Sequence, residues 1–139
     1  MNTTDQVQSR DGYSEKWQQR FAFFDEHGGP NSPTFKPAWL KLPLRQRIKI
    51  NANIIAFFFG PIYLFVLGLW KKNLTLIGLL LAVSVVAEIF YSATGFAYAK
   101  QLDLAIGIAI NAFYARTTNF AYYLKEVKGE QGWNPFKGC

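Results

Sequence analysis

The stretch LTLIGLLLAVSVVAEIFYSATGFAYA, residues 74–99, decides the fold of this chain because it is long and apolar enough to cross a lipid bilayer. A helix needs about 20 apolar residues to span a hydrocarbon core that is about 30 Å thick. The stretch meets this requirement with one internal charge, Glu88. We therefore predict a transmembrane helix over residues 74–99.

Two further apolar stretches flank it. LDLAIGIAINAFYARTTNFAYYL, residues 102–124, meets the same length requirement with a polar start and one arginine, and NIIAFFFGPIYLFVLGLW, residues 53–70, precedes it in the chain. The rest of the chain has too little polar helix to bury three such segments in a soluble core. We therefore predict an all-α protein with a membrane domain over residues 53–124, in which the last two stretches form a transmembrane helical hairpin.

The charge distribution agrees with this division. The chain has 139 residues, 50% of them hydrophobic, with a net charge of +6 and a mean hydropathy of only +0.04. A uniform soluble domain does not confine its charge to its two ends, and the aromatic and aliphatic content excludes a disordered chain. We predict a cytosolic and interfacial region over residues 1–52 and a basic cytosolic tail over residues 125–139. The charged residues between positions 53 and 124 are Lys71, Lys72, Glu88, Lys100, Asp103 and Arg116.

The segment 53–70 is interrupted near its middle by Gly60 and Pro61. Proline removes a backbone donor and clashes with the preceding turn, so we expect a kink or break there. Each half is then too short to cross a bilayer alone. Two alternatives remain open: a kinked full span, and a re-entrant segment that enters and leaves the membrane on the same face.

Positive charge near the segment ends favours the re-entrant alternative, because lysines and arginines collect on the cytoplasmic side. If the segment re-enters, the basic N-terminal region, Lys71, Lys72 and the basic tail all share that side. We therefore predict a multi-pass protein of the bacterial inner membrane with both termini in the cytoplasm. The cost of this arrangement is that non-helical backbone at membrane depth must be sheltered by protein.

The region 1–52 predicts amphipathic helices. Ser14 is typical of a helix N-cap, Trp17, Phe21 and Phe24 then fall on one helical face, and the Gly-Pro-rich run at 28–33 ends that helix. Basic residues alternate with aromatic and aliphatic ones just before the membrane domain, which favours a membrane-surface role over a packed cytosolic unit or nucleic-acid binding. The expected interfacial residues are Lys36, Trp39, Lys41, Arg45, Arg47 and Lys49, with Trp70, Lys71 and Lys72 at the next membrane boundary.

Signals of enzyme chemistry are nearly absent from the sequence. His27 is the only histidine, and Cys139 is the only cysteine and the last residue. A metal site or a catalytic triad needs more ligands or partners at workable spacing. We therefore predict no catalytic, metal-binding or cofactor-binding residues, and we expect that the protein is not an enzyme and does not bind nucleic acid.

Glu88 is the sharpest polar feature of the membrane domain. A charge near the bilayer centre costs about 2.5–3.5 kcal/mol on insertion scales, so it normally faces protein or water. A hairpin that turns about Gln101 would place Glu88 level with residues 113–114, near Asn111 and about one helical turn from Arg116. We predict that Glu88 is satisfied by Asn111, by Arg116 or by both. The alternatives are a proton-titrating carboxylate in a transport path and a contact with a partner protein.

Three strings of the chain carry a family resemblance: YSEKWQQRFAFFDEHGGPNSP at 13–33, RIKINANIIAFFFGPIYLFVLGLWKKNLTLIGL at 47–79 and NFAYYLKEVKGEQGWNPF at 119–136. They resemble the YigF-like proteins, small bacterial inner-membrane proteins of a domain-of-unknown-function family. The most specific part runs from 53 to 74, where three phenylalanines precede Gly60 and Pro61. The resemblance implies a Gram-negative inner-membrane location, and it implies no activity and no catalytic residues.

These observations together predict an uncharacterised integral membrane protein with the lipid bilayer as its surroundings. A non-enzymatic adaptor or accessory subunit is the leading hypothesis, because an aromatic, basic region is attached to a membrane unit too small to enclose a pore alone. Its partner is expected to be another membrane protein or a second copy of the chain. The alternative is a small oligomeric transporter or channel that uses Glu88 and the broken segment.

Overall fold

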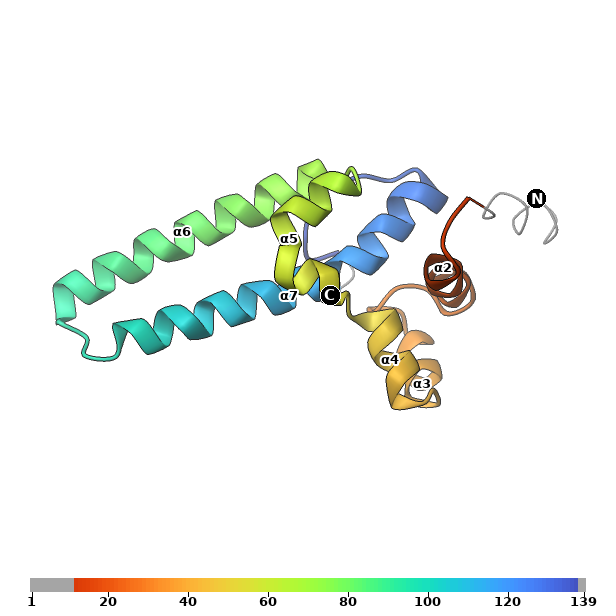
Figure 1. The fold of residues 1–139 in the computed structure, drawn as a ribbon, viewed down its shortest axis with the longest axis horizontal. Helices are drawn as coiled ribbons and strands as arrows, with labels where there is room; N and C mark the ends of the chain where they lie inside the picture. Colours follow the sequence, from red (N-terminus) through yellow and green to blue (C-terminus); the bar gives the residue numbers. More distant parts are fainter. Residues whose placement is uncertain (1–11, 138–139) are drawn as a thin grey trace.

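The computed structural model describes residues 12–137, and these residues form helices joined by turns, with no β-strand among them (Figure 1). The predicted all-α class is therefore confirmed for this part of the chain. The helices are α2 (Glu15–His27), α3 (Phe35–Leu40), α4 (Leu44–Asn51), α5 (Ile54–Val66), α6 (Trp70–Thr94) and α7 (Ala99–Lys128).

A long hairpin, which consists of α6 and residues 99–113 of α7, extends away from the rest of the protein (Figure 1). The 25 residues of α6 make it about 37 Å long at 1.5 Å per residue. The helix ends where Gly95 adopts a positive φ of 62° and its N–H donates to the Tyr91 carbonyl. Glycine is the residue that enters this left-handed conformation at least steric cost, so Gly95 is a C-terminal helix cap.

The position of the hairpin turn corrects the expectation from the sequence. The turn lies at residues 95–98, whereas Gln101 lies inside the first turn of α7. The polar residues near position 100 therefore begin a helix instead of forming the loop. The predicted helix 74–99 is a helix only up to Thr94, and the predicted helix 102–124 lies within the longer α7.

The other end of the protein is a compact unit, here called the head, formed by α2, α3, α4 and residues 114–128 of α7. The predicted helix after Ser14 is present as α2, which ends at His27 and is followed by Gly28 with a φ of 76°. Its predicted apolar face is buried, since Phe21 is 0% and Phe24 is 2% exposed. The head therefore has its own aromatic core, which contains Phe21, Phe24, Phe35, Ile50, Tyr123 and Leu124.

The broken segment forms α5, a kinked helix that lies against the base of the hairpin. Phe59 has non-helical angles (φ −126°, ψ 26°), immediately before the Gly-Pro pair that predicts the break. The Asn53 N–H donates to the Ala115 carbonyl at 2.9 Å, and Lys125 Nζ donates to the Leu67 carbonyl at 3.0 Å. Both ends of the segment are thus held by the part of α7 that belongs to the head, and neither end lies near the hairpin turn.

The kink brings α5 very close to α7 at Gly60. A Cβ atom added at this glycine would lie 2.6 Å from Cγ of Tyr114, which is shorter than real Cβ contacts allow. Both residues are buried, and Tyr114 is only 1% exposed. Gly60 is therefore required by the approach of the two helices as well as by the break in α5.

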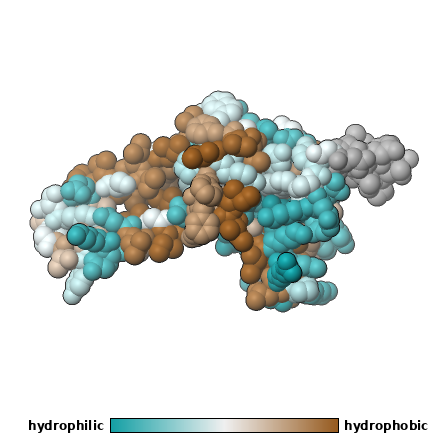
Figure 2. Space-filling view, in the orientation of Figure 1, coloured by the Kyte–Doolittle hydropathy of each residue, from teal (hydrophilic) through white to brown (hydrophobic). Residues whose placement is uncertain are grey.

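Apolar side chains cover the hairpin and α5, whereas hydrophilic ones gather over the head and at the hairpin turn (Figure 2). Two segments of the described chain are long and apolar enough to cross a bilayer by length and composition: Leu44–Val66, which contains α4 and α5, and Trp70–Thr94, which is α6. Only 6% of the most apolar window of α6 is buried in the protein. The predicted third span does not pass this test, because α7 is more polar than α6, and the C-terminal half of α7 is buried in the head.

The contact at Gly60 predicts a loss of stability on substitution. We expect Gly60→Ala to lower the free energy of unfolding by about 1–3 kcal/mol, because the new methyl group must push α5 away from Tyr114. The measurement is denaturant unfolding of the full-length chain in detergent micelles. Gly78→Ala in α6 is the matched control, since a Cβ there meets no atom within 4 Å, and equal losses in both variants would contradict the close contact.

Candidate functional site

A group of buried polar side chains, here called the polar seam, joins the head to the hairpin. The group consists of Asn53, Asn73, Tyr114 and Asn119. Asn119 lies at its centre, where its Nδ2 donates to the Ile50 carbonyl at 2.9 Å and its Oδ1 accepts from Asn53 Nδ2 at 3.0 Å. One carboxamide on α7 thus holds the end of α4 and the start of α5.

Asn53 has a second role as the N-cap of α5. Its Oδ1 accepts from the Ala56 N–H at 3.1 Å, which satisfies one of the free donors in the first turn of the helix. The backbone of Asn53 is extended (φ −119°, ψ 104°), and the chain changes direction here between α4 and α5. The asparagine therefore connects the start of the broken segment to α7 through both its backbone and its side chain.

The other half of the polar seam lies around the kink of α5. The Tyr114 hydroxyl donates to Asn73 Oδ1 at 3.0 Å, and Asn73 Nδ2 donates to the Pro61 carbonyl at 2.8 Å. Asn73 is 0% exposed. The first turn of α6 is therefore fastened both to α7 and to the residue that breaks α5.

The chemistry of the polar seam is that of a structural joint. Its members are three carboxamides and a phenol, all buried and each with a hydrogen-bond partner. Such groups position helices, and they supply neither an acid–base pair nor a strong nucleophile. Within residues 12–137, no three His, Cys, Asp or Glu residues lie together in a way that could hold a metal ion.

The chain after α7 folds back over the base of the hairpin. Lys72 is 1% exposed and its Nζ donates to the Gly132 carbonyl at 3.1 Å. The rings of Trp70 and Trp133 are 5.3 Å apart, and Lys71 Nζ lies 5.6 Å from the Trp70 ring. The predicted boundary residues Trp70, Lys71 and Lys72 are thus brought together here, in contact with the C-terminal segment.

The chain matches the family described as "Protein of unknown function (DUF2628)" over residues 5–128. The chain belongs to this family. It is 44% identical over 125 residues to "Uncharacterized protein YigF" of Escherichia coli (strain K12) and 42% identical to the protein of the same name in Salmonella typhimurium, and each alignment covers 87% of this chain and 90% of the relative. No solved structure matches the chain. The resemblance to the YigF-like proteins is therefore confirmed.

The predicted contact of Glu88 is not formed in this DUF2628 protein. The Tyr91 hydroxyl donates to Asp103 Oδ1 at 2.8 Å, and this contact joins α6 to α7 near the hairpin turn. Glu88 lies in a hollow beside Asp103 and Gly107, and no hydrogen bond or ion pair within residues 12–137 joins it to Asn111 or Arg116. The turn at 95–98 shifts α7 relative to the expected hairpin, which places Arg116 about 15 Å nearer the head than Glu88.

The predicted interfacial residues divide into two groups. Lys36, Lys41 and Arg45 are exposed. In contrast, Arg47 donates to the Leu42 carbonyl at 2.6 Å and to the Leu40 carbonyl, and Trp39 Nε1 donates to the Arg47 carbonyl at 3.0 Å. Arg47 and Trp39 thus stabilise the turn between α3 and α4 inside the head.

The sequence pattern did not indicate two basic residues of α2 as members of a site. Lys16 and Arg20 are one helical turn apart, and that spacing alone could have placed them on one face. The structure brings them next to Arg45 and Lys49 of α4. Their partners lie about 30 positions later in the chain, so no local pattern indicates this arrangement.

The central carboxamide of the polar seam predicts a specific sensitivity. We expect Asn119→Leu to destabilise the protein by about 1–3 kcal/mol for each buried group left unpaired, namely the Asn53 amide and the Ile50 carbonyl. Asn111→Leu removes the same group from an exposed position on the same helix and should change stability by less than about 0.5 kcal/mol. Unfolding in detergent micelles, followed by tryptophan fluorescence, measures both. Similar losses of stability in the two variants would contradict a structural role for the hydrogen bonds of Asn119.

Proposed function

We propose that this DUF2628 protein is an integral protein of the bacterial inner membrane, and that it serves there as a non-enzymatic adaptor or accessory subunit. The observation that carries the proposal is an exposed apolar hairpin attached to a head with its own core. The hairpin holds the chain in the bilayer, while the head presents a folded, basic surface in the cytoplasm.

The exposed surface of the hairpin supports the membrane location. Soluble proteins rarely expose contiguous apolar patches larger than a few hundred Å². On α6, Leu81, Val86 and Ile89 are 61–66% exposed, and the apolar surface continues onto α5 (Figure 2). Lipid is the partner that suits such a surface, because the exposed side chains of α6 and α5 that form it are apolar.

The charges at the two ends of the hairpin support its orientation. Near the turn, Lys100 is offset by Asp103, so this end carries little net charge. The base has Lys71, Lys72 and Arg116, and the end of α7 adds further lysines. The positive-inside rule therefore places the base and the head in the cytoplasm.

The placement of α5 fits the re-entrant alternative for the broken segment. Both ends of the segment are bonded to α7 on the head side, so the chain enters and leaves at one face of the membrane. The side chains of Phe58, Phe59 and Ile62 are 61–69% exposed and face lipid in this arrangement. The contacts with Tyr114 and Asn73 shelter the irregular backbone at the kink, as membrane insertion requires.

The adaptor role is favoured over a transport role by what the hairpin contains. A single hairpin is too small to enclose a pore, and Glu88 lies between the middle of α6 and the hairpin turn. A transporter would have to assemble its path from several copies of the chain. The head, in contrast, offers a stable folded surface without chemistry of its own.

Cysteine labelling tests the orientation. In a chain with Cys139→Ser, we expect a membrane-impermeant maleimide to label Tyr98→Cys from outside intact spheroplasts, because this residue lies in the hairpin turn and is 65% exposed. Lys71→Cys and Lys128→Cys should react only after lysis. Outside labelling at both lysine positions would contradict the orientation, and complete release by alkaline carbonate would contradict membrane insertion.

Purification from native membranes tests the adaptor role. We expect the tagged full-length chain, extracted in mild detergent, to bring along a second protein at constant stoichiometry, and Glu88→Gln to leave that complex intact. Recovery of only a monomer or homo-oligomer in several detergents would contradict the proposal. A homo-oligomer with pH-dependent flux in liposomes, lost in Glu88→Gln, would support the transport alternative instead.

A further inference from the structure

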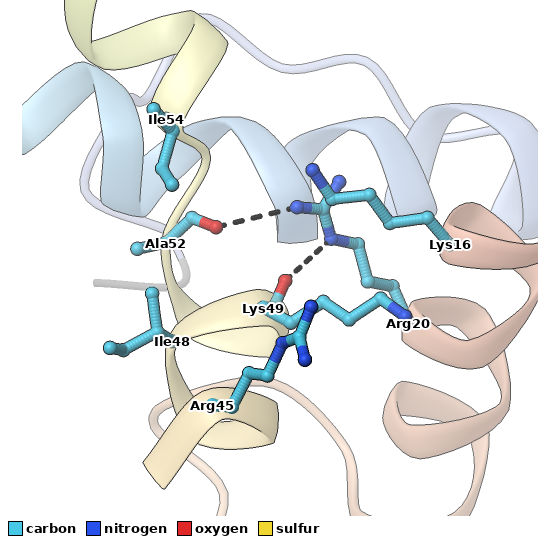
Figure 3. A pocket seen from close by; sticks show the side chains of 7 residues that line it. All are labelled: Lys16, Arg20, Arg45, Ile48, Lys49, Ala52 and Ile54. Atoms are coloured by element: carbon cyan, nitrogen blue, oxygen red, sulfur yellow. Dashed lines mark hydrogen bonds between the residues drawn. The ribbon is translucent and has the colours of Figure 1, made fainter.

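A pocket of about 340 Å³ between α2 and α4 is lined by four cations and no carboxylate. Figure 3 shows two of the cations reaching in from α2 and two from α4, with isoleucine side chains on the other side. The positive charges of these neighbouring side chains repel one another, so a cluster without a counter-ion is unfavourable unless an anion binds to it. The lining residues are Lys16, Arg20, Arg45, Ile48, Lys49, Ala52 and Ile54.

Arg20 is the deepest of these cations, with 1% of its surface exposed. Its guanidinium donates to the Lys49 carbonyl at 2.7 Å and to the Ala52 carbonyl at 3.4 Å, and it stacks over the Trp17 ring at 4.6 Å. These partners are neutral, so they leave the positive charge uncompensated. Burial accordingly lowers the pKa of Arg20 to about 10.

The other cations add positive charge around Arg20. Burial, together with the charges of Arg20 and Lys49, lowers the pKa of Lys16 below its usual value. Lys49 Nζ donates to Gln19 Oε1 at 2.6 Å, which is again a neutral partner, and Arg45 is exposed at the rim. Burying charge without a partner destabilises a fold, so this pocket is better suited to a ligand than to stability.

The pocket also has an apolar side that continues into the membrane-facing surface. Ile48 and Ile54 are 46% and 59% exposed, and Ile54 is the first residue of α5. Beyond it, Ile55 and Phe58 extend the exposed apolar face along α5. A ligand that reaches both sides has an anionic group next to a hydrocarbon chain, whereas a soluble anion would use only the cations.

We propose that this pocket binds the phosphate of an anionic phospholipid, whose acyl chains lie along the exposed face of α5. Arginine suits this role because its planar guanidinium matches two phosphate oxygens, and clustered basic residues at a membrane surface attract anionic lipids. The inference rests on the proposed membrane location, which places α4 and the start of α5 at the cytoplasmic surface.

The test measures binding of a short-chain phosphatidylglycerol to the purified full-length chain in a neutral detergent, with short-chain phosphatidylcholine as the headgroup control. We expect at least tenfold weaker phosphatidylglycerol binding in the Lys16→Gln/Arg45→Gln variant. The matched control is Lys36→Gln/Lys41→Gln, which removes two exposed charges outside the pocket and should stay within twofold of the unmodified chain. Circular dichroism confirms that both variants are folded.

Three results would overturn the proposal. Equal weakening in both variant pairs indicates diffuse attraction to the basic head. Equal binding of the two lipids indicates that the headgroup charge is not recognised. Competition by inorganic phosphate at the same concentration as the lipid indicates a site for a soluble anion. Membrane insertion is assayed separately by carbonate extraction. Release of the chain by carbonate would contradict the proposed function. The comparison of the two variant pairs would still show whether the pocket binds the lipid phosphate.

Discussion

The hydrogen bonds of the Asn119 carboxamide are the constraint on which the rest of the structure depends. They fix the end of α4 and the start of α5 to one turn of α7, where the surroundings of α7 change from the aromatic core of the head to the open hairpin. A buried carboxamide can serve several segments at once because it has both donors and acceptors. The junction is therefore held by direction-specific bonds as well as by apolar packing, which alone would let the segments slide.

The continuity of α7 makes the head and the hairpin one mechanical unit. The helix runs over 30 residues without a break, and Gly129 ends it with a φ of 68°. In the proposed membrane location, lipid surrounds the first half of α7. The core of the head surrounds its second half. Because no flexible linker separates the two halves, the depth and tilt of the hairpin in the proposed membrane location would set how the head faces the membrane surface.

Local patterns were sufficient to predict α2, the break in α5 and most of α6 and α7, but not the bounds of α3 and α4 or the way in which the helices meet. The start of α2 after Ser14, the apolar face through Phe21 and Phe24 and the break at Gly60 are all encoded within one or two turns of chain. The hairpin turn was misplaced because Gly95 looked like another small residue of an apolar helix, while the charges near position 100 looked like a loop. The Asn53–Asn119 bond joins residues 66 positions apart, and no periodicity in a single sequence indicates such a pair.

The connection between α4 and α5 links the polar seam to the basic pocket. Arg20 donates to the carbonyl of Ala52, and the next residue, Asn53, bonds to α7 through its backbone and its side chain. An anion bound beside Arg20 would therefore lie next to the same short connection that sets the direction of α5. Lipid binding at the head would thereby orient the broken helix, because the chain between Ala52 and Ile54 has no free residue that could absorb a change in direction.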